Sequence, residues 1–170
     1  MILILTGPPA AGKSTIGSLL ANKINRCAVI DVDMLRAMVV HPHTPPWEGN
    51  EGMAQLRLGA ANACILAQNF NRALFHVVIL DVLTDETARI YRHQLEQLDH
   101  RIVRLLPTLE TALQRNQARG QILTDAEVQL LYAWQTELTD YDQSIDNSSL
   151  PAKEVAATLL ASSAELIHTL

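Results

Sequence analysis

The sequence has few aromatic residues, few cysteines and no excess of basic charge. Aromatic residues make up 4% of the 170 residues, so we expect a core built mainly from leucine, isoleucine, valine and alanine. The two cysteines, Cys27 and Cys64, are too few for a disulfide framework and lack the CxxC spacing or histidine cluster of a zinc site. The net charge of −5 argues against a broad nucleic-acid-binding surface, because such a surface needs a basic face.

Long apolar runs are also missing. No run approaches the roughly 20 residues that cross a bilayer as a helix. Residues 1–5 are apolar, but they lack a basic flank and lead straight into a glycine loop, so we expect a buried strand and not a signal peptide. With 48% hydrophobic residues, the chain is expected to form a single cytoplasmic domain over residues 1–170, without membrane contact.

Short apolar runs alternate with helical stretches along the chain, which is typical of a parallel sheet covered on both faces. The predicted strands are residues 2–6, 28–31, 75–81, 102–106 and 144–146. The predicted helices are residues 13–23, 34–40, 51–71, 84–98, 109–119, 125–139 and 152–168. Residues 41–50, HPHTPPWEGN, contain three prolines, which exclude a helix or a central strand. A loop of this kind within a domain is usually functional or mobile.

The strongest motif is GPPAAGKST at residues 7–15, which matches GxxxxGK[ST] and lies between a predicted strand and a predicted helix. Such a loop points backbone N–H groups at phosphate oxygens, and the helix offers its N-terminus to the same anion. Lys13 can bridge the outer phosphates of a nucleotide, Ser14 can ligate magnesium, and Thr15 can contact an inner phosphate. The expected nucleotide-binding residues of the loop are Gly7, Pro8, Ala10, Ala11, Gly12, Lys13, Ser14 and Thr15.

Three acidic residues follow predicted strands. Asp31 and Asp33 end the second strand and, two residues apart on an extended chain, would point to the same side. We expect Asp33 to accept a proton from an acceptor hydroxyl and Asp31 to order the magnesium shell, although either residue could instead cap the next helix. Asp81 ends the third strand, as in a Walker B strand. It could bind a magnesium-bound water or cap the turn toward Thr84.

Several other side chains could reach a substrate. Arg36 lies three residues after Asp33 on the same helix face, where it could hold an anionic substrate or pair with Asp33. Trp47 could stack on a planar substrate or pin the proline-rich loop, and Arg57 could approach the acceptor or remain on the surface. Arg115 and Arg119 share a helix face, where arginines can stabilise the charge of a transferred phosphoryl group or simply interact with the helix dipole.

Together these motifs resemble the small P-loop kinases of the nucleoside-monophosphate-kinase-like branch, over nearly the whole chain. That branch includes shikimate kinase, gluconate kinase, chloramphenicol phosphotransferase and zeta-toxin relatives, often described as AAA-family ATPase-like proteins. The resemblance implies an α/β P-loop NTPase fold, a three-layer sandwich with a five-stranded parallel sheet of order 2-3-1-4-5 and helices on both faces. It also implies a substrate-binding insert at about residues 34–72, a lid at about residues 115–125, and a place for Asn147 beside the adenine.

The sequence departs from the resemblance at two places. Asp81 is not followed by the glycine pair with which shikimate kinase holds its acceptor, and the proline-rich loop with Trp47 matches none of the substrate motifs of the named enzymes. We therefore expect a phosphotransferase that uses ATP and Mg²⁺ and acts on an unidentified small-molecule hydroxyl. The alternatives are a nucleotide-binding regulatory ATPase and, against the acidic charge, a nucleic-acid end kinase. The acceptor and the oligomeric state are left open.

Overall fold

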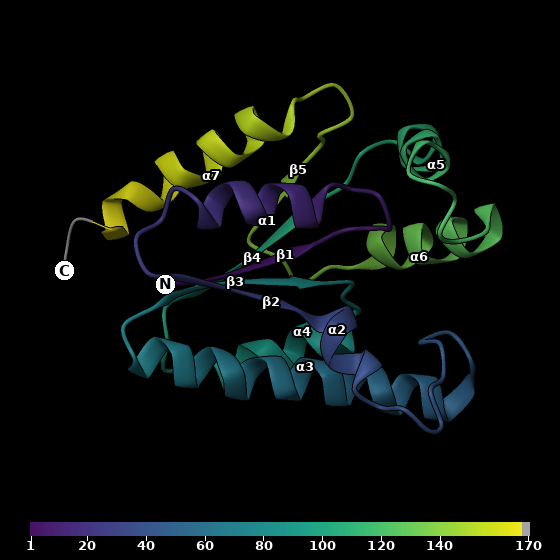
Figure 1. The fold of residues 1–170 in the computed structure, drawn as a ribbon, viewed down its shortest axis with the longest axis horizontal. Coiled ribbons are helices and arrows are strands. Elements are labelled where there is room, and N and C mark those ends of the chain that lie inside the picture. Colours follow the sequence, from purple (N-terminus) through teal and green to yellow (C-terminus); the bar gives the residue numbers. More distant parts are fainter. Residues whose placement is uncertain (168–170) are drawn as a thin grey trace.

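A computed structural model describes residues 1–167 and contains a five-stranded, all-parallel sheet (Figure 1). The strand order, β2-β3-β1-β4-β5, confirms the predicted topology. The strands are β1 (Ile2–Thr6), β2 (Cys27–Asp31), β3 (His76–Asp81), β4 (His100–Leu105) and β5 (Gln143–Ile145). The helices are α1 (Lys13–Ala21), α2 (Val32–Ala37), α3 (Gly49–Arg72), α4 (Asp85–Gln94), α5 (Leu109–Ala118), α6 (Asp125–Glu137) and α7 (Ala152–Ile167).

The helices cover both faces of the sheet, so the core has two halves. Helices α1 and α7 lie on one face, whereas α3 and α4 lie on the other (Figure 1). The half under α3 and α4 contains Ile4, Ile79 and Ala60, and the half under α1 and α7 contains Leu5, Val103 and Leu159. Among the side chains described, those of residues 1–162, Tyr91 is the only buried aromatic residue, as the low aromatic content predicts.

The carboxyl ends of the central strands meet at one edge of the sheet. Thr6 of β1 pairs with Asp81 of β3, and Asp31 of β2 pairs with Leu80 of β3. Gly7 continues from β1 so close to the neighbouring strand that an added Cβ would overlap the carbonyl oxygen of Leu105. In an open α/β sheet this edge is where ligands bind.

Helix α2 begins two residues earlier than predicted, and this corrects the geometry expected for the acidic pair. The Asp31 carboxylate accepts a hydrogen bond from the Asp33 backbone N–H at 3.1 Å, so Asp31 is the N-cap and the helix starts at Val32. Asp33 therefore lies in the first helical turn, and the prediction that both carboxylates belong to one extended segment was wrong. The helix also ends at Ala37 instead of residue 40.

Most other helix and strand boundaries lie within two residues of their predicted positions. The largest difference is at α4, which ends at Gln94 because Leu95 leaves the helical conformation (φ −106°, ψ 11°), so the predicted extension to residue 98 was wrong. The predicted caps of α4 and α6 are present, with Thr84 accepting from the Thr87 backbone N–H and Thr124 from that of Glu127. The predicted last helix included residue 168, which lies outside the described residues.

The proline-rich segment contains no helix or strand up to Glu48, and it packs against α3. Gln55 of α3 accepts a hydrogen bond from the Thr44 backbone N–H at 3.1 Å and donates one to the Pro42 carbonyl at 2.7 Å. Gly52 lies so close to the segment that an added Cβ would overlap the Pro45 carbonyl oxygen. The loop is thus held to the helix by hydrogen bonds and by close packing.

Over the described residues, no helix has the length and apolar character required of a membrane span.

Candidate active site

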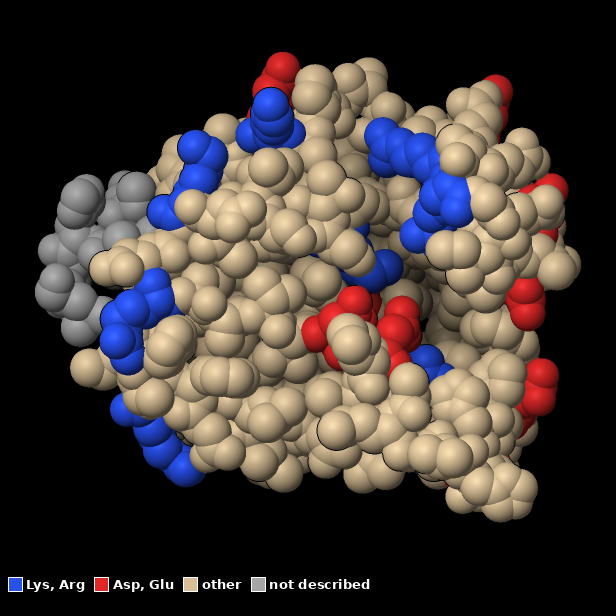
Figure 2. All heavy atoms as spheres, in the orientation of Figure 1, with Lys and Arg blue, Asp and Glu red and all other residues tan. Residues whose placement is uncertain are grey.

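A cavity of about 810 Å³ lies at the carboxyl edge of the sheet. Figure 2 shows acidic and basic side chains facing each other in the hollow between the α5–α6 region and the α2 region. The cavity is lined by residues 9–16, which belong to α1 and to the GxxxxGK[ST] loop at residues 7–15, which we call the phosphate loop. Residues of α2 and the proline-rich loop, and residues of α5, α6 and the segment before α7, complete the lining. This volume lies within the range typical of small-molecule and cofactor pockets.

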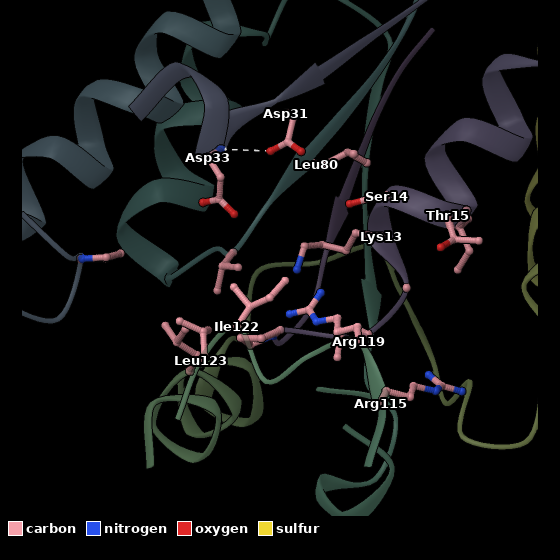
Figure 3. Close-up of a pocket in the computed structure, with 18 of the residues that line it drawn as sticks. Lys13, Ser14, Thr15, Asp31, Asp33, Leu80, Arg115, Arg119, Ile122 and Leu123 are labelled. Carbon is pink, nitrogen blue, oxygen red and sulfur yellow. Dashed lines mark hydrogen bonds between the residues drawn. The ribbon is translucent and has the colours of Figure 1, made fainter. Parts of the chain in front are cut away.

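Lys13 lies in the centre of the cavity, at the first position of α1. Its ammonium group donates hydrogen bonds to the carbonyls of Gly7 at 2.7 Å and Pro8 at 3.1 Å, so the side chain folds back over the loop (Figure 3). Burial lowers the pKa of Lys13 from 10.5 to about 8, although the carboxylates of Asp33 and Asp81 act in the opposite direction. The group is therefore mostly a cation at neutral pH, and it lies over the loop carbonyls.

Asp31 and Asp33 both line the cavity, although they belong to different elements (Figure 3). The Asp31 side chain is occupied in capping α2, which is the structural alternative that the sequence left open. The side chain of Asp33 is 77% exposed and contacts the guanidinium group of Arg36 at 3.5 Å. Of the two carboxylates, that of Asp33 is therefore the more available to a bound molecule.

Asp81 is buried beneath the phosphate loop and does not line the cavity wall. One carboxylate oxygen accepts from the Val82 backbone N–H at 2.8 Å, and the other accepts from the Tyr91 hydroxyl at 2.8 Å. Burial raises the pKa of Asp81 from 3.8 to about 6, while the two hydrogen bonds and Lys13 lower it. Tyr91 was not predicted as a site residue, because the sequence gives no sign that this α4 residue reaches the end of β3.

The residues proposed for substrate contact separate into two groups. Arg36, which is 9% exposed, and Trp47 line the cavity. Arg36 also donates to the Thr44 carbonyl at 3.4 Å, and its Nε is buried without a partner. Arg57 does not line this cavity, and instead its guanidinium pairs with Glu86 of α4 at 3.2 Å.

The two arginines of α5 point in different directions (Figure 3). Arg119, at the end of the helix, extends toward Lys13 and contributes to lowering the pKa of Lys13. Arg115 points away from Lys13 and donates to the carbonyls of Asn147 at 2.8 Å and Ser148 at 3.2 Å. Asn147 is buried and donates to the Ala11 carbonyl at 2.8 Å, whereas its amide oxygen has no partner. Arg115 and Asn147 therefore join the segment before α7 to α5 and to the phosphate loop.

The sequence analysis missed much of the apolar lining of the cavity. Residues of α3, of α6, of the segment between α5 and α6 and of the segment after β3 contribute apolar side chains that belong to no motif. These residues are Leu56, Val82, Ile122, Leu123, Leu131 and Trp134. The helical periodicity of α6 could have indicated one apolar face, but it could not distinguish a face toward the core from one toward a cavity.

Comparisons with known proteins agree with this architecture. A gluconokinase from Sinorhizobium meliloti 1021 matches with a TM-score of 0.69 and 19% identity, over 98% of this chain and 93% of that chain. Shikimate kinase from Acinetobacter baumannii, in complex with shikimate, matches with a TM-score of 0.62 and 20% identity, over 99% of this chain and 94% of that chain. APS kinase CysC from Mycobacterium tuberculosis, in complex with AMPPNP and APS, matches with a TM-score of 0.66 and 19% identity, over 94% of this chain and 95% of that chain. No curated protein matches the sequence significantly.

The parallel sheet of order 2-3-1-4-5, with a phosphate loop between β1 and α1, defines the fold of the small P-loop kinases. Residues 2–138 match the AAA domain family, and the chain therefore belongs to that family.

Proposed function

We propose that this protein transfers the γ-phosphoryl group of Mg²⁺-ATP to a hydroxyl group of a small molecule. The observation that carries this proposal is a single cavity that is lined by Lys13, Asp33 and Arg119 and has room for a nucleotide and an acceptor. The structural neighbours support it at the level of fold, since they include kinases in complex with shikimate and with APS. The proposal covers residues 1–170 as one domain, with residues 34–72 as the acceptor-binding insert and residues 115–125 as the lid.

The nucleotide would bind along the phosphate loop. Its phosphates would meet the N-terminus of α1 and the Lys13 ammonium, and its base would lie beside Arg115 and Asn147. The buried amide oxygen of Asn147 lacks a partner and can accept a hydrogen bond from the amino group of adenine. Guanine presents an oxygen at the equivalent position, so this contact favours ATP over GTP.

The side chains around the phosphate loop fit magnesium. Ser14 offers a hydroxyl, and Asp31 offers the carboxylate oxygen that does not cap α2, and both are donors of the kind that Mg²⁺ prefers. The Asp81 carboxylate is buried and already accepts two hydrogen bonds, so it would act through a magnesium-bound water. Magnesium normally keeps several waters and binds with substrate phosphates. Within residues 1–167, no group of three or more His, Cys, Asp or Glu could hold a metal ion without such further ligands. When bound, the ion supplies charge neutralisation for the phosphoryl group.

The residues of the chain supply the remaining parts of the reaction. Asp33 accepts the proton of the acceptor hydroxyl as the acceptor oxygen bonds to the γ-phosphorus, and the bond from the γ-phosphorus to the bridging oxygen breaks to release ADP. Lys13 and Arg119 stabilise the negative charge that develops on the phosphoryl oxygens and the leaving group. Arg36 holds Asp33 through the contact at 3.5 Å, and Trp47 contacts the acceptor.

The proposal is tested by ADP release with Mg²⁺-ATP across a panel of hydroxyl compounds that includes sugars, sugar acids, aromatic alcohols, aminoglycosides and nucleosides. One class should accelerate the rate, and Lys13→Ala should reduce that rate by about a hundredfold or more, because the main phosphate-binding cation is lost. Lys23→Ala is the matched control, since Lys23 is exposed and outside the cavity. Full activity of Lys13→Ala would refute the site, and ATP binding without any acceptor effect would favour a regulatory ATPase.

A further inference from the structure

The part of the cavity beyond the phosphate loop is mainly apolar. We call it the acceptor pocket, and it consists of the cavity-lining residues of α2, the proline-rich loop, α3, the segment after β3, the lid and α6. Its apolar members are Ala37, Pro45, Pro46, Trp47, Leu56, Val82, Ile122, Leu123, Leu131 and Trp134. Its polar members are Asp33, Arg36, His43 and the lid arginines Arg115 and Arg119, and Asp31 lies at its border with the phosphate loop.

Most of these polar side chains already have partners within the protein. Arg36 contacts Asp33 at 3.5 Å and the Thr44 carbonyl at 3.4 Å. The His43 ring nitrogen Nδ1 lies 3.2 Å from the Val39 carbonyl, and Asp31 caps α2. Among the described residues Asp33 pairs only with Arg36 and its side chain is 77% exposed, and Arg119 is exposed and extends toward Lys13. The pocket therefore offers one well-placed hydrogen-bond acceptor, one available cation on its phosphate-loop side, and few further groups for a polar molecule.

The two prolines of the proline-rich wall supply no backbone donors. Pro45 and Pro46 have no N–H group, and the Thr44 N–H is bonded to Gln55. The Gln55 amide also bonds to the Pro42 carbonyl and to Glu51 at 2.8 Å, so it is directed at the loop. The loop packs so tightly on Gly52 that it has little freedom to present other groups. This wall is an apolar surface fixed to α3.

We infer that the acceptor is an alcohol with a largely apolar, planar body and few hydroxyl groups, of which the reacting one faces Asp33. This inference rests on the proposed function and names its substrate class. An apolar body gains from burial against aliphatic side chains, and an aromatic ring can pack on Trp47 or Trp134. A sugar acid would bury several hydroxyls without partners, and each of these weakens binding by about tenfold.

The two tryptophans allow a direct binding test, because Trp47 and Trp134 are the only tryptophans of the chain and both line the pocket. Each gives one indole N–H resonance in an NMR titration. The probes are 3-phenylpropan-1-ol and D-gluconate, each added to the full chain with Mg²⁺ and a non-hydrolysable ATP analogue. We expect 3-phenylpropan-1-ol to shift both resonances and to bind at least tenfold more tightly than D-gluconate. With Mg²⁺-ATP it should also accelerate ADP release.

The possible results separate the inference from the proposed function. Tighter binding of D-gluconate, or no shift with 3-phenylpropan-1-ol, would overturn the apolar acceptor class. If D-gluconate alone accelerated ADP release, the phosphotransferase proposal would stand without that class. If 3-phenylpropan-1-ol bound as expected but no hydroxyl compound were phosphorylated, the apolar site would stand and the phosphotransferase proposal would fail.

A matched pair of variants tests whether the apolar lining of the acceptor pocket causes the preference for 3-phenylpropan-1-ol over D-gluconate. Val82→Thr adds a hydroxyl to the pocket with almost no change of shape, and we expect it to weaken 3-phenylpropan-1-ol binding several-fold and to reduce the preference over D-gluconate. Val29→Thr makes the same change on β2, at a residue that is 42% exposed and outside the cavity, and should leave both affinities unchanged. Equal effects of the two variants would contradict the inference.

Discussion

At the scale of single residues, Asp81 couples the stability of the fold to pH. Its pKa is about 6 in the folded protein and 3.8 in the unfolded chain, chiefly because burial disfavours the charged form. Between these two values the folded state binds more protons, so stability falls as pH rises from about 4 to 6. The difference of about 2 pKa units corresponds to a cost on the order of 3 kcal/mol at neutral pH, where the buried carboxylate is ionised.

The variant Asp81→Asn should remove this pH dependence. The Asn side chain can still accept from the Val82 N–H and can donate to the Tyr91 hydroxyl, so the buried hydrogen bonds can be kept. We expect the variant to be more stable than the natural chain at pH 7.5, and to lose that advantage near pH 4.5. Urea unfolding of both proteins without nucleotide, at several pH values, measures the difference in their free energy of unfolding. If this difference stayed constant across pH, the assignment of the pH dependence to Asp81 would be contradicted.

The Tyr91 hydroxyl acts on the same carboxylate in a predictable direction. Its hydrogen bond lowers the pKa of Asp81, so Tyr91→Phe should raise that pKa above about 6 and move the fall in stability to higher pH. The Asp81 carboxyl resonance, followed by ¹³C NMR titration, reports the pKa directly. Tyr132→Phe is a suitable control because Tyr132 is on α6 and is neither buried nor part of this pair. An unchanged or lower pKa in Tyr91→Phe would refute the prediction.

At the scale of elements, Arg104 ties the end of the sheet to α6. This residue of β4 is 9% exposed, and its guanidinium donates to the carbonyls of Gln135 at 2.8 Å and Leu138 at 3.1 Å. It also donates to the hydroxyls of Ser144 and Tyr141, and it stacks on the Tyr141 ring at 4.0 Å. The planar guanidinium group of Arg104 donates at once to the end of α6, to β5 and to the segment between them, which the single ammonium group of a lysine cannot do.

Arg104→Lys should therefore destabilise the protein by about 2–3 kcal/mol, since buried carbonyls and a hydroxyl lose their donor. Arg101→Lys changes the same residue type on the same strand, where the guanidinium donates one hydrogen bond, to Gln143 at 3.3 Å, and it should cost less than about 1 kcal/mol. Guanidinium chloride unfolding of both variants gives the comparison. Equal losses in the free energy of unfolding would show that the additional hydrogen bonds of Arg104 do not stabilise the fold.

The elements also show where sequence reasoning succeeds. The phosphate loop could be predicted because its contacts are local and its spacing is fixed by backbone geometry. The acidic pair was found but misplaced, because the N-cap at Asp31 turns the chain into a helix before Asp33. Trp134 could not be assigned to the cavity, since its position depends on how α6 packs beside β1. Long-range hydrogen bonds, such as the one at 2.9 Å from Thr6 to Gln135, fix that packing and leave no mark on local periodicity.

At the scale of the whole molecule, the cavity joins parts of the chain that are far apart in sequence. The phosphate loop lies at one end of the chain, while Asn147 and Pro151 come from the segment before the last helix. Arg115 links that segment to α5, and Asn147 links it to the loop at Ala11. A molecule bound in the cavity therefore contacts the first and the last segments of the fold together, and its binding energy adds to the stability of the whole domain.

Mg²⁺-ATP should accordingly raise the thermal midpoint of the entire chain in one cooperative transition. A ligand present at 100 times its dissociation constant stabilises the folded state by about 2.7 kcal/mol. For a domain of this size such a gain corresponds to a shift of several degrees. Differential scanning calorimetry should show the shift with Mg²⁺-ATP, and a smaller one with ATP and EDTA because the phosphate charge is then less neutralised. Lys13→Ala should abolish most of the shift and Lys23→Ala should keep it. A nucleotide effect that is equal in these two variants would place the binding site away from the phosphate loop.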